Sequence, residues 1–112
     1  MDAKIDDITF FDGDTVFLTA EVQYSDSYYV SKYRELIIMA DIENVAGGTI
    51  DLILQVSIDN SFWVDQDQFK QITATGYYEK RFTNFGRWIR LEFVPSVAAT
   101  LGSNGIVGSV KT

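Results

Sequence analysis

Apolar and polar side chains alternate along much of this chain. The clearest run covers residues 50–59, where every second residue from Ile50 to Ile58 is a branched aliphatic one. The same period of two recurs over 88–93 and over 16–23, where Val16, Leu18, Ala20 and Val22 form the apolar side. Successive side chains of a β-strand point to opposite faces, so this period predicts half-buried strands of antiparallel sheets with one face in solvent.

The segment 34–42 supports two interpretations. Arg34–Ala40 contains good helix formers, whereas Leu36, Ile38, Ala40 and Ile42 alternate as in a strand. The β-branched residues in this segment and the turn signal at 46–48 that follows it favour a strand.

Turn signals separate the predicted strands. Asp12-Gly13-Asp14 predicts a hairpin turn between 8–11 and 15–18, and a glycine-containing loop at 101–105 precedes a short last strand at 106–111. Further turns are expected at 46–48, 59–61 and 84–86. Seven to nine short strands without a long helix are typical of an all-β protein, here a single antiparallel β-sandwich or jelly-roll-like domain covering residues 1–112.

Composition removes several kinds of chemistry. The 112 residues include no His and no Cys, which excludes His-dependent nucleophile pairs, thiolate or imidazole metal sites and disulfides. The formal net charge is −7, with 14 of the 16 acidic but only three of the nine basic residues in 1–67. This balance disfavours duplex nucleic acid as a partner. No signal-peptide layout or membrane-spanning apolar run is present, so we expect a soluble protein made in the cytoplasm, without a membrane partner.

Carboxylates are the remaining candidates for a site. Asp59, Asp65 and Asp67 lie close together in the sequence around a turn, and oxygen ligands on a loop suit a calcium ion. Their spacing matches no EF-hand, and Asp and Asn are turn formers in their own right, so we expect no metal and no cofactor. No acidic pair stands in a setting distinctive of glycoside hydrolysis, and we expect no enzyme activity.

Aromatic residues offer a different kind of site. Tyr24, Tyr28, Tyr29 and Tyr33 fall in a Ser-rich polar stretch, and tyrosine provides a large contact area with few rotatable bonds. We therefore expect a protein interface formed by these four tyrosines together with Arg81 and Arg90. The alternative is a carbohydrate-binding module that presents Tyr28, Tyr29, Tyr33 or Trp88 to a glycan.

Four segments in the C-terminal half to two-thirds of the chain form a pattern. They are Leu54-Gln55-Val56-Ser57-Ile58-Asp59 with Trp63 soon after, Thr73-Ala74-Thr75-Gly76, Phe82-Thr83-Asn84-Phe85-Gly86-Arg87-Trp88-Ile89-Arg90, and the glycine-containing last strand. This pattern resembles small β-sandwich virion proteins of tailed bacteriophages. Within this pattern Trp63 is expected to plug one end of the core, and Phe85-Gly86 to form a tight corner.

The resemblance implies a non-enzymatic structural part of a virus particle. The expected component is a capsid decoration or cement protein, or a neck or tail accessory, that docks on a particle lattice through edge strands and the tyrosine stretch. Its expected partners are major capsid or tail proteins and further copies of itself, and its expected location is the virion.

Overall fold

The computed structural model describes residues 5–83 and 85–112, and this part of the chain is all-β. It forms ten strands, where we expected seven to nine, and contains no helix long and apolar enough to cross a membrane. The strands are β1 (Ile5–Phe11), β2 (Val16–Phe17), β3 (Gln23–Tyr24), β4 (Tyr28–Tyr29), β5 (Glu35–Asn44), β6 (Ile50–Ser57), β7 (Val64–Gln68), β8 (Gly76–Phe82), β9 (Trp88–Pro95) and β10 (Ala99–Lys111).

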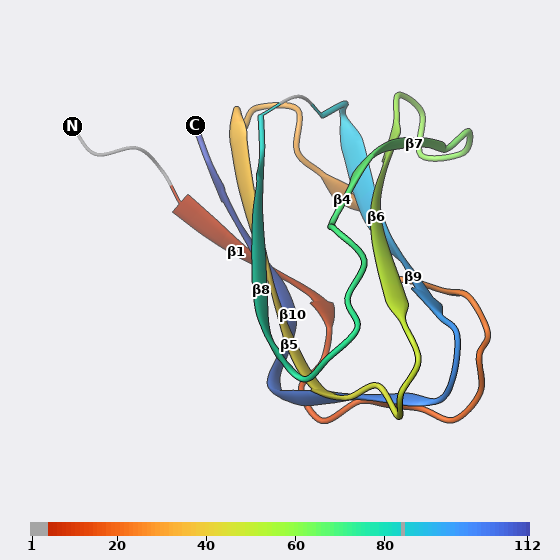
Figure 1. Cartoon of the computed structure of the whole chain (residues 1–112). Coiled ribbons are helices and arrows are strands. Elements are labelled where there is room, and N and C mark those ends of the chain that lie inside the picture. Colours follow the sequence, from red (N-terminus) through yellow and green to blue (C-terminus); the bar gives the residue numbers. More distant parts are fainter. Residues whose placement is uncertain (1–4, 84) are drawn as a thin grey trace.

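The strands form two antiparallel sheets that pack face to face (Figure 1). Sheet A has the order β1-β10-β5-β8, with β2 also paired to β10, and sheet B has the order β3-β9-β6-β7, with β4 also paired to β9. The expected β-sandwich is therefore confirmed. The segment 34–42 lies mostly in β5, so its strand interpretation is also correct.

The core is made by the alternate residues of the long strands. β5 buries Leu36 and Ile38, β6 buries Leu52 and Leu54, and β9 buries Leu91, all with no measurable exposure. The connection between β7 and β8 closes one open side of the sandwich, because its Phe69 contacts Phe82 of sheet A, and the Phe69 amide donates to the Leu52 carbonyl of sheet B at 3.0 Å.

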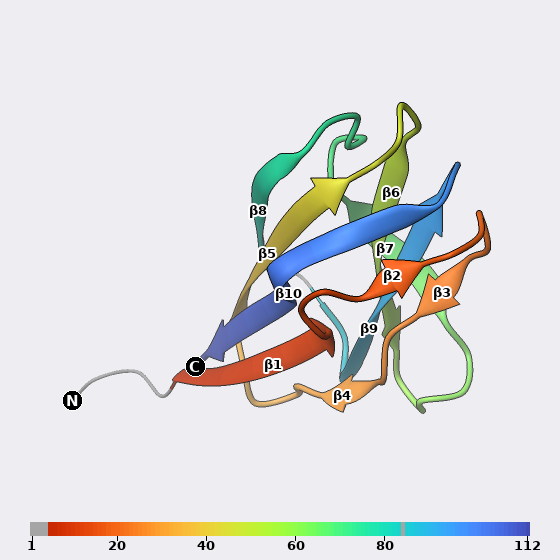
Figure 2. The same cartoon turned by 90° about the horizontal axis from the view of Figure 1, so that it is seen from below.

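Two outer edges of the sandwich are each built from two short pieces of chain (Figure 2). β1 and β2 pair with successive parts of β10, and β3 and β4 pair with successive parts of β9. The turn at Asp12-Gly13-Asp14 therefore interrupts an edge strand, and the prediction of a hairpin there was wrong. Splitting both edges also explains why the strand count exceeds the expected one.

The alternating stretch 16–23 does not form one strand. Only Val16–Phe17 and the start of β3 are strands, and the buried residue is Phe17, which stacks on Phe93 with ring centroids 4.1 Å apart. The expected apolar side faces solvent instead, with Leu18 82% exposed. The large ring of Phe17 fills the space between the sheets, so register is set by this one aromatic residue rather than by four smaller aliphatic ones.

The glycine-containing segment 101–105 is also different from the expected loop. It lies within the single long strand β10, which pairs with β5 on both sides of a bulge between Leu101 and Ile106. Gly105 has a φ of +67°, and a β-carbon there would lie 2.3 Å from the Phe11 carbonyl oxygen. The bulge therefore fits against the interruption in the neighbouring edge strand.

Replacing Gly105 by alanine tests this fit. Gly47 is a matched control, since its φ is +77° but nothing lies within 4 Å of the place that a β-carbon would take. Gly47→Ala should lower the free energy of unfolding by about 1 kcal/mol through backbone strain alone. Gly105→Ala should lower the free energy of unfolding, measured by urea denaturation, at least about twice as much, because its β-carbon would also clash with the Phe11 carbonyl. Equal losses for the two variants would show that the close approach of the chains is unimportant.

Candidate functional site

The outer face of sheet B carries a large group of surface aromatic residues. β9 buries Ile89 and Leu91 on one side and turns Trp88, Arg90 and Glu92 outward. Tyr24 of β3 pairs with Glu92, and Tyr29 of β4 pairs with Trp88, so both tyrosines lie beside these outward residues. This placement follows directly from the period-two alternation of the strands.

Arg90 lies on this face between two aromatic rings. Its guanidinium carbon is 4.2 Å from the centroid of the Tyr24 ring and 4.5 Å from that of the Trp63 ring. Both distances are well within the range in which a cation is attracted to a ring face. Three segments far apart in the sequence are thus held together by one side chain.

A buried glutamine orients the arginine. The Arg90 Nε donates a hydrogen bond to Gln55 Oε1 at 2.7 Å, and Gln55 Nε2 donates to Asp65 at 2.9 Å and to Glu92 at 3.2 Å. Gln55 is buried, so its amide is fixed in one orientation by these three partners. We call Tyr24, Gln55, Trp63, Asp65, Arg90 and Glu92 the arginine cluster.

The connection between β6 and β7 adds exposed apolar residues next to the arginine cluster. Phe62 is 71% exposed and immediately precedes Trp63, and Ile58 and Val64 are exposed as well. Asp59 holds the turn, because its Oδ1 accepts hydrogen bonds from the amides of Ser61 and Phe62, both at 2.9 Å. These amides, and then the Ser57 hydroxyl, lower the pKa of Asp59. A fixed turn therefore presents Phe62 to solvent.

The structure brings three of the six expected interface residues to this face: Tyr24, Tyr29 and Arg90. Tyr28 instead packs edge-on against Phe10, and its hydroxyl donates to the Thr9 carbonyl at 2.6 Å. Burial, followed by the nearby acidic residues, raises the pKa of Tyr28. Tyr33 also packs against the core, with Lys32 over its ring.

Arg81 is on the other sheet. It lies on β8 of sheet A, where its Nε is 3.1 Å from Glu35. It therefore cannot act together with Arg90 at one surface, because the two arginines project from different sheets.

The expectation that Trp63 plugs the core was wrong. Trp63 is only partly buried and lies over Arg90 instead of between the sheets. It sits between the end of β6 and the start of β7, at the edge of sheet B, where the outer face offers a cation for its ring. Gln55 was not expected to be functional either. The sequence indicated only that Gln55 is a polar residue on the outward side of the strand 50–57. The structure shows that it lies opposite Arg90 on the neighbouring strand.

The three candidate metal ligands have separate partners. Asp59 caps the turn, Asp65 accepts from Gln55, and Asp67 lies 3.7 Å from the Lys80 ammonium. Within residues 5–83 and 85–112, no group of three or more acidic side chains is arranged to hold a metal ion. Their oxygens instead serve turn capping and polar contacts.

Comparisons with known proteins identify the fold. No family model matches the sequence, and no curated protein matches it. Among solved structures, the chain is similar to PBSX exported protein XepA (TM-score 0.67, 10% identity), over 96% of this chain and 36% of that one. It is similar to SPBc2 prophage-derived protein YomS (TM-score 0.60, 12% identity), over 100% and 96% of the two chains. It is also similar to PirA (TM-score 0.52, 11% identity), over 96% and 93%.

These likenesses show a shared β-sandwich fold. The chain spans about a third of the length of XepA but nearly all of YomS, so the sandwich forms nearly the whole chain in one neighbour and a part of a longer chain in the other. YomS is described as prophage-derived, so a phage-encoded protein shares the fold of this chain at 12% identity.

Substituting Arg90 by lysine tests the arginine cluster. Lysine keeps the charge but loses the planar group that stacks on both rings and the Nε donor, so stability should fall by about 1–2 kcal/mol, and the fluorescence of Trp63 should change. Arg87→Lys is the control, because Arg87 is exposed and its side chain has no contact of this kind among the described residues. The same thermal unfolding midpoint for both variants would contradict the stacking of Arg90.

Proposed function

We propose that this chain is a non-enzymatic structural protein of a tailed-bacteriophage particle. It is made in the host cytoplasm and docks on the particle as a capsid decoration or cement protein, or as a neck or tail accessory. The docking surface is the arginine cluster together with Tyr29, Ile58, Phe62 and Val64.

The observation that carries this proposal is the order already present in the arginine cluster. Exposed aromatic residues and arginine are the residue types that dominate binding energy at protein interfaces. Arg90 is held by Gln55 and by two rings, so little side-chain freedom remains to be lost when a partner binds.

The fold comparison supports the class of protein. YomS is described as prophage-derived, and it matches this chain over nearly the whole of both sandwiches. XepA is described as an exported protein of PBSX. These origins agree with the resemblance that residues 54–59 and 82–90 show to small phage virion proteins.

Partner choice would follow from charge and from repetition. A chain of net charge −7 selects partners with a basic surface, and a particle lattice multiplies contacts that are individually weak. Major capsid or tail proteins with a basic surface are partners of this kind, and further copies of this chain would occupy the repeated positions of the lattice.

Particle binding is the direct test. A tagged chain would be supplied to a phage that lacks the gene, and the particles would be purified by density gradient and probed for the tag. We expect the wild-type chain in the particle band and about tenfold less of a Tyr24→Ser, Phe62→Ser variant. Leu18→Ser is the control, because Leu18 is also highly exposed but lies between β2 and β3. A wild-type chain that remains entirely outside the particle band would contradict the proposal.

Carbohydrate binding is the second candidate, favoured by the rings of Tyr24, Tyr29 and Trp88 beside the carboxylate of Glu92. Tyr28 and Tyr33 are no longer part of it, because both pack against the core. On a glycan array, this candidate predicts saturable binding that Tyr29→Ala abolishes and Tyr77→Ala, on the other sheet, leaves intact. Particle docking predicts no glycan signal for any of the three proteins.

A further inference from the structure

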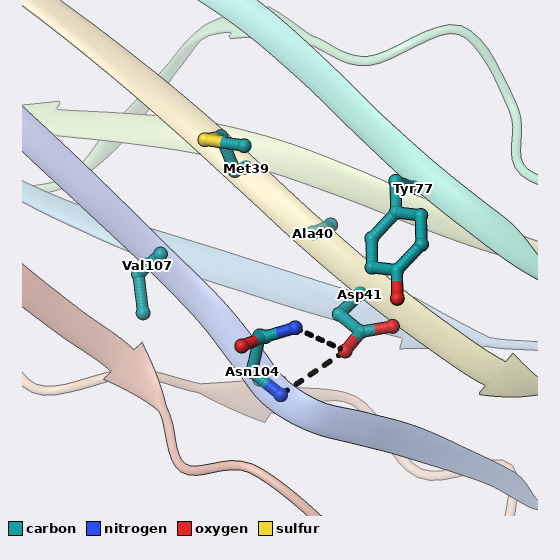
Figure 3. Close-up of a pocket in the computed structure, with 7 residues that line it drawn as sticks. Met39, Ala40, Asp41, Tyr77, Asn104 and Val107 are labelled. Carbon is teal, nitrogen blue, oxygen red and sulfur yellow. Dashed lines mark hydrogen bonds between the residues drawn. The ribbon is translucent and has the colours of Figure 1, made fainter.

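The outer face of sheet A contains a shallow trough that the proposed docking surface does not use. It consists of two adjoining hollows, of about 290 and 560 Å³, that share Met39 of β5 and Val107 of β10. Figure 3 shows the smaller hollow. One hollow extends to Asp41, Tyr77 and Asn104, and the other to Asp7, Glu79 and Ser109. The trough therefore crosses four neighbouring strands, from β1 to β8.

The floor of the trough is apolar. Met39 pairs in register with Val107, and Ile37 lies two residues before it on the same face. Met39 is 49% exposed, and Tyr77, which pairs with Asp41 at one end, is 76% exposed. Apolar side chains on the outside of a sheet gain favourable free energy when a partner covers them.

Asp41 places a carboxylate at one end of this apolar floor. It is only 8% exposed, and its Oδ2 accepts hydrogen bonds from the backbone amide of Asn104 at 3.0 Å and from the Asn104 side-chain amide at 3.1 Å (Figure 3). Gly102 leaves room for it, because a β-carbon there would lie 2.3 Å from Oδ1. Among the described residues, Oδ1 accepts no hydrogen bond and Asp41 makes no ion pair.

Within residues 5–83 and 85–112, no cation pairs with the carboxylates that line the trough. Asp7 and Glu79 line the trough and, within the described residues, make no ion pair. Arg81 follows Glu79 by two residues on β8, and Lys111 follows Ser109 by two residues on β10; both pair with Glu35, at 3.1 and 3.3 Å. A second copy of this chain would therefore bring three more unpaired carboxylates to the trough, which argues against self-association here.

We infer that this trough binds an extended segment of a partner protein in which basic and apolar side chains alternate. Met39 and Asp41 are two residues apart on one strand face, and side chains on one face of an extended segment recur at about 7 Å. An apolar side chain of the partner covers Met39 and Val107, and the next side chain on that face, Lys or Arg, reaches Asp41 Oδ1. The stem of that basic side chain lies along the Tyr77 ring.

Peptide binding tests this inference independently of particle binding. The probe is a short fluorescent peptide in which two lysines alternate with two valines, so that lysine and valine alternate along each face of the extended peptide. It is titrated with the full chain, and binding is followed by fluorescence anisotropy. Two comparison peptides replace lysine by glutamate or valine by serine. We expect saturable binding of the lysine–valine peptide, at least about tenfold weaker binding of the lysine–serine peptide and none of the glutamate–valine peptide.

Variants then locate the site. Asp41→Asn should lower the affinity of the chain for the lysine–valine peptide at least about tenfold. Glu21→Gln removes an exposed charge outside the trough and should leave that affinity unchanged. A combined Asp7→Asn, Glu79→Gln variant alters only exposed side chains, and it should weaken binding about threefold even if Asp41→Asn fails to fold. Equal affinity for all folded variants, equal binding of the lysine–serine peptide, or dimerisation of the chain through this face would each overturn the inference.

Discussion

The structure depends on the burial of alternate side chains from two sheets against each other. β5 and β10 of sheet A and β6 and β9 of sheet B supply most of the completely buried aliphatic residues, and each of these strands is central in its sheet. Because the chain has no disulfide, this packing supplies most of the stabilisation of the fold. It also fixes the opposite side of every strand, so residues such as Gln55, Arg90 and Met39 must face outward. Both candidate binding surfaces are thus by-products of one packing arrangement.

The outer faces of the two sheets differ in charge and in hydrogen bonding, although their strand geometry is the same. On sheet B, a buried glutamine and two rings hold a cation in place, and the polar groups of the arginine cluster are largely satisfied by one another. On sheet A, the buried carboxylate of Asp41 lies at the end of an apolar floor, and its Oδ1 accepts no hydrogen bond from the described residues. The first surface is complete before a partner arrives, whereas the second presents an unmatched charge. The two faces are therefore suited to partners of different chemistry.

The sequence predicted the central strands β6 and β9 well and the edge segment 16–23 poorly. The alternation over 50–57 and 88–93 gave correct predictions because both strands lie in the middle of a sheet, where one face is buried along the whole strand. The stretch 16–23 alternates just as clearly, yet it lies at an edge, where a single pair of residues such as Phe17 and Ala99 suffices to anchor the chain. Position in the sheet, which a local pattern does not contain, decided the difference.

The arginine cluster could be predicted only in part for a related reason. Arg90 and Tyr24 were expected at an interface, but their meeting with Trp63 depends on which strands are neighbours. Alternation places a residue on a face and gives no strand order. Gln55 illustrates the same limit, since its importance appears only once β6 is known to lie beside β9. The bulge in β10 was hidden because glycine is common both in loops and at close contacts between chains.

The interrupted edges of the sandwich limit aggregation of this protein through strand addition. The edge pieces β2, β3 and β4 are only two residues long each, so they expose only short lengths of unpaired backbone. A neighbouring molecule therefore finds no long template there on which to add a strand, and runaway fibre growth is suppressed at these margins. At these margins a neighbouring copy can therefore associate only through side chains, even when the protein is concentrated.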